Sequence, residues 1–244
     1  MAYFITGFSY VPQYCPQFDP INEDGSKFFD PKNEEVSDYQ GCRGLSFNAL
    51  KTGHRLDETT NPTPASVYRF AKMAGATKIL PDIFHAGPEI CVNQKVKDAI
   101  EVLEPSEHQF LPITLMRTKK KAFEGSYYLL VIGQALDSVI FEESNLRWQV
   151  TRSGSKYVQP GINPEDYRTL WKSKITAKHL WRERMYLRDI YISDQLYQKL
   201  MELKVRGIDA RNYRKALEKD GPNAPVPQPN EEPLSRSIIK FIRG

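Results

Sequence analysis

The clearest pattern in the chain is a short apolar strand followed by a polar capping residue and an amphipathic helix. Residues 90–92 (Ile-Cys-Val) precede Asn93, and Val96, Ile100 and Leu103 then recur at helical spacing. Apolar side chains three and four positions apart lie on one face of a helix. Asn is favoured at an N-cap because its side-chain oxygen accepts a hydrogen bond from an otherwise unpaired first-turn amide. The pattern predicts a strand, a cap and a helix.

The same pattern recurs one hundred residues later. There the strand, the cap and the three apolar positions are residues 190–192, Ser193, Leu196, Leu200 and Leu203. A strand-like segment follows each helix pattern, at 108–115 in the first unit and 207–210 in the second. Strand-cap-helix is a common local pattern, so the match can be a coincidence. The matched apolar positions in register nevertheless favour a true pseudo-repeat.

A β-rich centre is predicted between the two units. Residues 127–132 form a continuous apolar run, which is typical of a strand covered on both faces. Residues 139–141 predict a second strand, and residues 148–158 predict a hairpin that turns near 153–155. Residues 2–8 also read as a strand, because they are uncharged and rich in aromatic and β-branched side chains.

Three helices are expected outside the repeated units. One covers residues 65–73, one starts at 163–166 and runs to about 172, and a basic one runs from about 211 to 219. Residues 177–186 are amphipathic and fit either state. The predicted fold class is therefore α+β, with a β-rich core, short helices and two strand-cap-helix units.

The two ends of the chain have irregular composition. Residues 11–64 are interrupted by Pro, Gly, Asn and Asp, with one short strand expected at 44–50, and segments this irregular are uncommon in compact domains unless they are functional or mobile. Residues 221–233 hold five prolines, which excludes a helix or central strand. We expect a single domain over 1–220 with a loop-rich insert at about 11–64, and a Pro-rich tail with a short apolar end over 221–244.

Charge is distributed unevenly, although the formal net charge of +4 is too small to indicate a partner. Residues 19–38 hold seven acidic and two basic residues, whereas residues 172–219 hold thirteen basic and six acidic residues. No apolar run approaches the roughly 18 residues of a membrane span, and the first residues lack the positive start of a secretory signal. The three cysteines match no zinc or redox spacing. A cytoplasmic location is the simplest expectation.

The sequence contains none of the common catalytic motifs. It has no GxxxxGK[ST] or GxGxxG phosphate cradle, no GxSxG nucleophile elbow and no HExxH zinc motif. His85 lies six residues from Cys91, but a cysteine between strand aliphatics is usually a small buried hydrophobic residue. Lys119 to Lys121 form a short basic run that is typical of a turn surface. We therefore predict no catalytic residue, no metal site and no cofactor.

The motifs described above resemble those of a known family. The blocks PEICVNQKVKDAIEVLE, HQFLPITL, GSYYLLVIGQALDSVIFEES and RDIYISDQLYQKLMELKVRGID are similar to the eleventh immunity-protein family of bacterial polymorphic toxin systems, first catalogued as a domain of unknown function. The family's aspartate and serine after the YYLL strand correspond to Asp137 and Ser144. The resemblance covers residues 79–220 well and 11–64 poorly, which suggests that this insert is particular to the present chain. It implies a structural scaffold with no catalytic residues to transfer.

The resemblance implies a cytoplasmic antidote that binds the C-terminal domain of a cognate toxin. Such toxins are often nucleases of the HNH or AHH type, delivered by a contact-dependent apparatus such as type VI secretion. Acidic and aromatic residues of the irregular segment are the candidate toxin contacts, and they would mimic DNA charge in a basic nuclease groove. These residues are Glu23, Asp24, Phe28, Phe29, Asp30, Glu34 and Glu35. A solvated acidic loop, a nucleic-acid-binding protein that uses the basic 172–219 face, and an unrecognised enzyme stay as alternatives.

Overall fold

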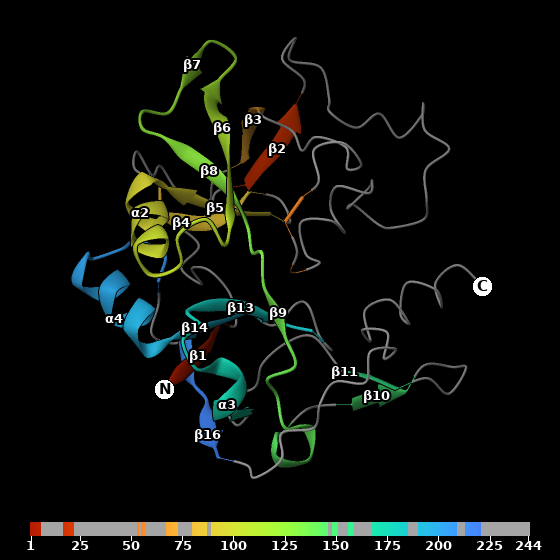
Figure 1. Ribbon diagram of the computed structural model, residues 1–244. Helices are drawn as coiled ribbons and strands as arrows, with labels where there is room; N and C mark the ends of the chain where they lie inside the picture. Colours follow the sequence, from red (N-terminus) through yellow and green to blue (C-terminus); the bar gives the residue numbers. More distant parts are fainter. Residues whose placement is uncertain are drawn as a thin grey trace.

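The fold is β-rich and contains only short helices, which confirms the predicted α+β class (Figure 1). The computed structural model describes residues 1–5, 17–21, 53, 55–56, 67–72, 80–86, 89–145, 148–150, 156–158, 167–184, 190–208 and 213–220. Three predicted features lie outside these residues: the candidate toxin contacts at 23–35, the short strand expected at 44–50 and the tail at 221–244.

Two larger sheets make up most of the described structure. The first has the order β2 (Gln17–Ile21), β3 (Val67–Lys72), β6 (Gln109–Thr118), β8 (Tyr127–Val131), β5 (Glu89–Asn93) and β4 (Ile83–Ala86), with β7 (Lys121–Ala122) paired to β6. The second has the order β15 (Tyr213–Lys215), β1 (Ala2–Ile5), β14 (Ile190–Ser193), β13 (Leu180–Glu183) and β9 (Ala135–Leu136).

Two strand pairs and four short helical segments complete the described elements. β10 (Trp148–Val150) and β11 (Lys156–Val158) form the predicted hairpin, and β12 (Thr169–Trp171) runs parallel to β16 (Leu217–Lys219). The helical segments are α2 (Gln94–Leu103), α4 (Asp194–Glu202), the single turn α3 (Lys172–Ile175) and the 3-10 turn η2 (Phe141–Glu143).

The predicted pseudo-repeat is confirmed, and it includes a hairpin strand that the sequence pattern did not reveal. β4, β5 and α2 form the first unit, and β13, β14 and α4 form the second. The hairpins have equivalent registers, since Ile83 pairs with Val92 and Leu180 pairs with Ile192. Both predicted caps are present: Asn93 Oδ1 accepts from the Val96 amide at 3.2 Å, and Ser193 Oγ accepts from the Leu196 amide at 3.1 Å.

The equivalence extends to a third strand that pairs with each central strand. β8 pairs antiparallel with β5, and β1 pairs antiparallel with β14. These strands place Tyr128 opposite Val92 and Tyr3 opposite Ile192. Each tyrosine hydroxyl then donates to the first residue of the helix: Tyr128 to Gln94 Oε1 at 2.6 Å, and Tyr3 to Asp194 Oδ1 at 3.1 Å. β1, the first strand of the chain, therefore completes the second unit as β8 completes the first.

A fourth antiparallel strand lies outside the third strand in each unit. β6 pairs with β8, and β15 pairs with β1. The first unit thus contains the order β6-β8-β5-β4, and the second contains the order β15-β1-β14-β13. The two fourth strands differ in length, because β6 has ten residues and β15 has three.

One hydrophobic cluster is shared by both units, with α2 and α4 side by side (Figure 1). It contains Ile90, Val92, Val96, Ala99 and Ile100 of the first unit, and Ile190, Ile192, Leu196 and Leu200 of the second. Each sheet has a further cluster on its opposite face. Its members at equivalent positions are Phe84, Cys91 and Leu129 in the first sheet, and Trp181, Tyr191 and Phe4 in the second. Both faces of each central strand are therefore buried.

The segment after each helix binds the first strand of the other unit. After α4, the Arg206 carbonyl accepts from the amides of Asp82 at 2.7 Å and Ile83 at 3.2 Å, at the start of β4. After α2, the Glu104 carboxylate accepts from the amides of His179 and Leu180 at 2.9 Å each, at the start of β13. The two units thus hold each other through reciprocal contacts.

Gly207 allows the first of these contacts to form. A side chain at this position would place Cβ 2.0 Å from the Ile83 carbonyl oxygen, and the backbone φ of +105° is in the region that favours glycine. The chain after α4 can therefore approach β4 closely only because residue 207 has no side chain.

Glu104 accepts two further hydrogen bonds inside the molecule. The Gly133 amide donates to His108 Nδ1 at 3.1 Å, so the neutral ring carries its proton on Nε2 and donates to Glu104 Oε2 at 2.8 Å. Gln134 Nε2 donates to Glu104 Oε1 at 2.6 Å. Burial of Glu104 alone raises its pKa, but the hydrogen bonds from His108, His179 and Gln134 outweigh burial and lower the pKa below its usual value.

Several local predictions were wrong. The helix expected at 65–73 is strand β3, because its Val, Tyr and Phe residues pair between β2 and β6 and long-range pairing overrides a weak helix pattern. The basic helix expected at 211–219 is strands β15 and β16 within 213–219. The helix expected over 163–172 is strand at 169–171, and helix begins only at Lys172; residues 163–166 lie outside the described part.

Two expected strands are also corrected. Residues 139–141 form one isolated bridge, between Val139 and Leu170, followed by the η2 turn. Gly207 lies in a turn and Ile208 in no regular element, which removes the strand expected there; residues 209–210 are not described. No helix in the described ranges is long and apolar enough to cross a bilayer.

Replacing Glu104 by Gln tests the reciprocal contact. We expect the free energy of unfolding to fall by about 3 kcal/mol, since an amide cannot accept from all four donors and places its own N–H groups against them. Chemical denaturation measures this loss. The matched control Glu107→Gln, on an exposed side chain three residues away, should change stability by less than about 0.5 kcal/mol. Equal stability of both variants would contradict the role assigned to Glu104.

The pH dependence of stability gives a second test of the same contact. The lowered pKa of Glu104 stabilises the fold above the unfolded value of about 4.3, and this contribution is lost as the pH falls through the folded pKa. Gln does not titrate. The stability difference between the wild-type protein and Glu104→Gln should therefore shrink as the pH is lowered from 6 to about 3, as urea titrations at each pH would show. A difference independent of pH would contradict the assignment.

Candidate binding surface

The predicted basic face at 172–219 is divided among α3, β13, α4 and β16. Arg182 is buried, and this burial lowers its pKa to about 10. Four other cations of the described part bind carboxylates, in the pairs Lys172–Asp220 (3.3 Å), Arg184–Asp137 (3.5 Å), Arg206–Asp82 (3.0 Å) and Lys219–Glu143. Five of the thirteen cations counted in this stretch are therefore paired or buried within the described residues. Trp181, an aromatic residue within this stretch, is fully buried and stacks on Tyr191 with ring centroids 5.7 Å apart, so it offers no ring face to a nucleic-acid base.

A different surface combines exposed cations with partly exposed apolar and aromatic side chains. Alternation along β6 directs Leu111, Ile113 and Leu115 into the cluster with Phe84 and Cys91. The opposite side of β6 is only partly covered, because α2 packs on β5 and β8. We call this side the β6 face, and it consists of Phe110, Pro112, Thr114 and Met116 of β6 with Tyr128 of β8.

The β6 face has an aromatic end next to α2. The rings of Phe110 and Tyr128 meet edge to face, with centroids 6.5 Å apart. The Lys97 ammonium of α2 lies over both rings, 5.4 Å from the Phe110 centroid and 5.7 Å from that of Tyr128. This arrangement fixes the two rings and places a positive charge at the edge of the β6 face.

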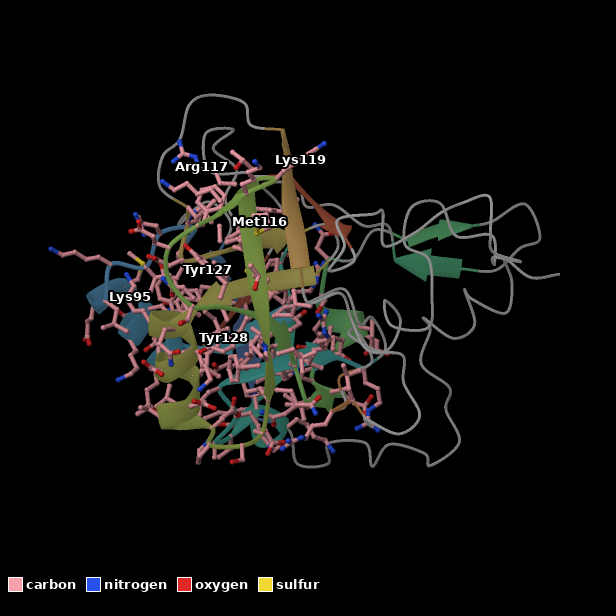
Figure 2. All side chains as sticks on the ribbon, turned by 90° about the horizontal axis from the view of Figure 1, so that it is seen from above. Lys95, Met116, Arg117, Lys119, Tyr127 and Tyr128 are labelled. Carbon is pink, nitrogen blue, oxygen red and sulfur yellow. The ribbon has the colours of Figure 1, made fainter. Side chains whose placement is uncertain are left out.

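The other end of β6 carries a group of cations, which we call the basic tip. It consists of Arg117, Lys119, Lys120 and Lys121, where β6 turns into β7. All four side chains are exposed, and Figure 2 shows Arg117 and Lys119 on either side of the end of β6, beyond Met116. Within the described ranges none of the four has an ion-pair partner. The run was predicted to be a turn surface, and it is one.

The basic tip is held in place by main-chain pairing. β7 pairs with β6 through Met116–Ala122 and Thr118–Lys121. The Phe123 amide donates to the Leu115 carbonyl at 2.8 Å, and the Phe123 ring packs against Phe18 with centroids 6.1 Å apart. The cations therefore extend from an ordered hairpin that is anchored in the core.

The cysteine and histidine considered as a nucleophile pair do not form one. The β4–β5 register places Cys91 opposite Phe84 and His85 opposite Ile90, so the two side chains leave opposite faces of the sheet. Cys91 is fully buried, and burial raises its pKa well above the usual value. The group is therefore a protonated thiol in the core, whereas His85 is exposed.

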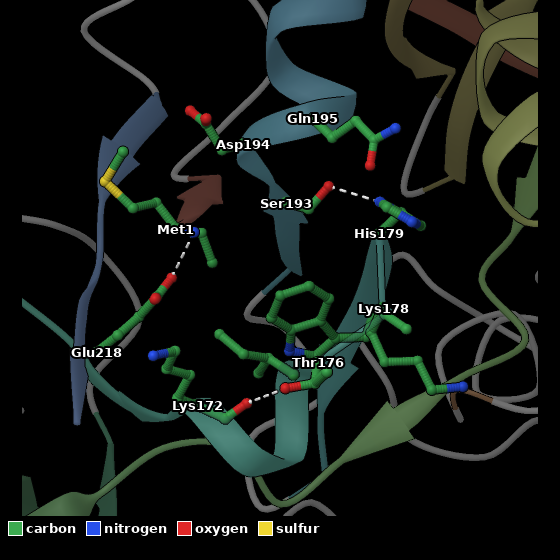
Figure 3. A pocket seen from close by; sticks show the side chains of 13 residues that line it. Met1, Lys172, Thr176, Lys178, His179, Ser193, Asp194, Gln195 and Glu218 are labelled. Atoms are coloured by element: carbon green, nitrogen blue, oxygen red, sulfur yellow. Dashed lines mark hydrogen bonds and ion pairs between the residues drawn. The ribbon is translucent and has the colours of Figure 1, made fainter. Parts of the chain in front are cut away.

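A cavity of about 340 Å³ opens beside the start of α4 (Figure 3). Trp181 and Ile175 line it together with the polar residues Lys178 and Gln195. Its one direct histidine–hydroxyl contact in the described structure joins His179 Nδ1 to Ser193 Oγ at 2.8 Å. A serine beside a histidine is the starting arrangement for nucleophilic catalysis, which requires the hydroxyl to be free to attack.

The Ser193–His179 pair has a structural role instead. Ser193 Oγ already accepts the Leu196 amide as the cap of α4. The first unit has the same arrangement, where Asn93 caps α2 and donates through Nδ2 to Asp82 Oδ1 at 2.7 Å. In both units the backbone amide of the cap residue donates to the carbonyl of the residue that its side chain contacts. Asn93 donates to Asp82, and Ser193 donates to His179, at 2.9 Å each. Since a pair without a hydroxyl occupies the equivalent place, we assign both pairs to helix capping.

The two family positions taken from the resemblance also make internal contacts. Asp137 pairs with Arg184, and Ser144 Oγ donates to the Ile140 carbonyl at 2.6 Å while accepting from the Thr169 amide at 3.0 Å. No group of three His, Cys, Asp or Glu side chains suited to a metal ion occurs among the described residues.

The β6 face and the basic tip have the chemistry of a protein-binding surface. Tyr, Phe, Met and Arg are enriched in interfaces, where anchors lie within a charged rim. Sequence reasoning did not find this surface, because β6 is apolar on both faces and only its pairing partners show which face is buried. The alternation of Leu111, Ile113 and Leu115 was the available signal.

The chain was then compared with known proteins. No curated protein matches it. A sequence model of the immunity protein family Imm11 matches residues 27–215. The match begins further toward the N-terminus than the resemblance did, so residues 27–64 of the expected insert lie within the matched region. Because the match includes both strand-cap-helix units and most of the chain, this chain belongs to the immunity protein family Imm11.

Proposed function

We propose that this protein is a non-catalytic immunity protein that binds and neutralises a cognate toxin. The observation that carries the proposal is the family match over residues 27–215, which contains the whole repeated core except β1. The described side chains support it, because the two nucleophile–histidine combinations are accounted for by core packing and helix capping. The protein therefore acts by occupancy of the toxin and not by turnover.

The proposed setting is the cytoplasm of a bacterium that carries a polymorphic toxin system. The toxin domain is the C-terminal part of a larger protein, delivered between cells by a contact-dependent apparatus of the type VI kind. An antidote has to keep free toxin at a very low concentration. Such inhibition requires a dissociation constant of roughly 1 nM or less, which corresponds to about −12 kcal/mol.

We further propose that the toxin is a nuclease of the HNH or AHH type. The support is the composition of residues 19–38, where seven acids and two phenylalanines occur within twenty residues. A nuclease groove is basic because it binds phosphates, and an acidic segment with aromatic anchors has complementary chemistry.

Protection of cells tests the immunity function. We expect the toxin domain encoded directly upstream to kill cells when expressed alone, and co-expression of this protein to restore growth. The purified pair should form a complex with a dissociation constant near or below 1 nM by titration calorimetry with displacement. Full lethality in the presence of well-expressed protein would contradict the proposal.

Neutralising the acidic segment tests the nuclease-groove proposal. A variant with Glu23, Asp24, Glu34 and Glu35 changed to Gln or Asn should bind the toxin at least tenfold more weakly, because complementary interface charges contribute at least about 1.4 kcal/mol together. The matched control changes four exposed acids elsewhere to Gln or Asn: Glu107, Glu142, Glu202 and Asp220. Unchanged toxin affinity in the first variant would remove this segment from the interface and leave the immunity function standing.

A further inference from the structure

We infer that the β6 face and the basic tip bind an acidic surface of the toxin. The inference rests on the proposed function and adds the chemistry of the partner. The occupant is a toxin segment rich in Asp and Glu that also carries an apolar or aromatic side chain. The carboxylates meet the basic tip, and the apolar side chain meets Met116, Pro112 and the edge of Tyr128.

Charge is the first argument. Four cations lie within residues 117–121, and the nearest acid along the chain, Glu124, forms no ion pair with any described residue. Some cations elsewhere are matched, as in the pairs of Arg206 with Asp82 and Lys219 with Glu143. Like charges concentrated at one point repel each other, and an acidic partner relieves this repulsion. The basic tip is thus complementary to an acidic surface.

Order is the second argument. The tip is fixed by β7 pairing and by the Phe123–Leu115 hydrogen bond, and Leu115 is 2% exposed in the core. A rigid hairpin loses little conformational entropy when it binds, so more of the interaction energy appears as affinity. Thr114 and Pro112 are exposed beside the tip, which leaves room for the partner backbone on the β6 face.

The aromatic geometry favours a protein over a nucleic acid as the occupant. Sequence-tolerant nucleic-acid binding requires free ring faces on which bases stack. The rings of Phe110 and Tyr128 are instead engaged with each other edge to face and lie under the Lys97 ammonium. A partner on the β6 face would therefore contact ring edges and the Met116 side chain. These groups pack well against apolar side chains of a protein.

The test is charge reversal at the tip. The probe is the inactivated C-terminal toxin domain encoded upstream, and the variant is Lys119→Glu/Lys120→Glu/Lys121→Glu. Its association rate constant should fall at least about tenfold at roughly 50 mM salt, and the difference should shrink at roughly 500 mM salt because added ions screen the charges. The matched control is Lys174→Glu/Lys204→Glu/Lys215→Glu, which changes the net charge equally on α3, after α4 and on β15. The control should associate at nearly the wild-type rate.

A second variant tests the β6 face separately. Thr114→Glu adds one carboxylate at an exposed position, so the fold should persist, as circular dichroism would confirm. The toxin should then dissociate at least about tenfold faster, because a like charge is introduced against an acidic partner. Wild-type dissociation of this variant would exclude the β6 face from the interface.

The remaining outcomes separate the inference from the proposed function. If the tip variant and its control associate with the toxin equally slowly, the effect comes from net charge alone. That result would overturn the inference. The tip variant could also lose binding to a 20-bp DNA duplex that the wild-type protein binds, while its association with the toxin stays unchanged. That result would make the tip a nucleic-acid contact and would also overturn the inference. If wild-type protein does not bind the toxin at all, the proposed function fails and this inference fails with it.

Discussion

The fold depends on a reciprocal exchange between its two halves. The residues after α2 bind the start of β13 through the Glu104 carboxylate, and the residues after α4 bind the start of β4 through the Arg206 carbonyl. Each contact uses backbone amides that have no hydrogen-bond acceptor in their own hairpin. Neither half can therefore form all its backbone hydrogen bonds alone. The shared apolar cluster would allow the halves to slide, but directional hydrogen bonds to a buried carboxylate fix one arrangement.

The duplicated architecture makes the differences between the halves informative. Position for position, the caps, the hairpins and the hydroxyls of Tyr128 and Tyr3 serve the same purpose. The fourth strands do not: β15 ends after three residues, whereas β6 continues through Met116 into the basic tip. Packing explains the part that the two units share, since each unit must bury its own helix against the shared cluster. Packing also uses much of the longer strand, because Leu115 lies in the core and β3 pairs with residues 114–116. The cations beyond Met116 are exposed and make no ion pair within the described ranges, so they are the part best explained by a partner.

The sequence predicted what local chemistry determines. Asn93 and Ser193 were recognised as caps, and the apolar stripes behind them identified both helices, because capping and helical spacing are properties of a few neighbouring residues. The strands at 67–72 and 213–219 were taken for helices, since their state is decided by partners distant in the chain. For the same reason the sequence did not indicate that Glu104 and His108 form a buried pair, or that Glu104 binds the second unit. The β6 face was invisible until the pairing of β6 showed which of its two apolar sides is covered.

A basic, rigid tip suits an immunity protein because the toxin has to be bound before it damages the cell. The rate of capture therefore competes with the rate of toxin turnover. Without steering, protein pairs associate at about 10⁶ M⁻¹s⁻¹, and roughly 1 µM of antidote then captures a toxin in about one second. An enzyme of median speed completes about ten turnovers in that time. Charge complementarity raises association rates to about 10⁸ M⁻¹s⁻¹ or more, which shortens capture to about ten milliseconds, less than one turnover. Exposed charges contribute little to the stability of a complex, but they act at a distance before contact. Cations that make no ion pair within the described structure, at the end of an anchored strand, therefore suit a protein that has to capture its partner quickly.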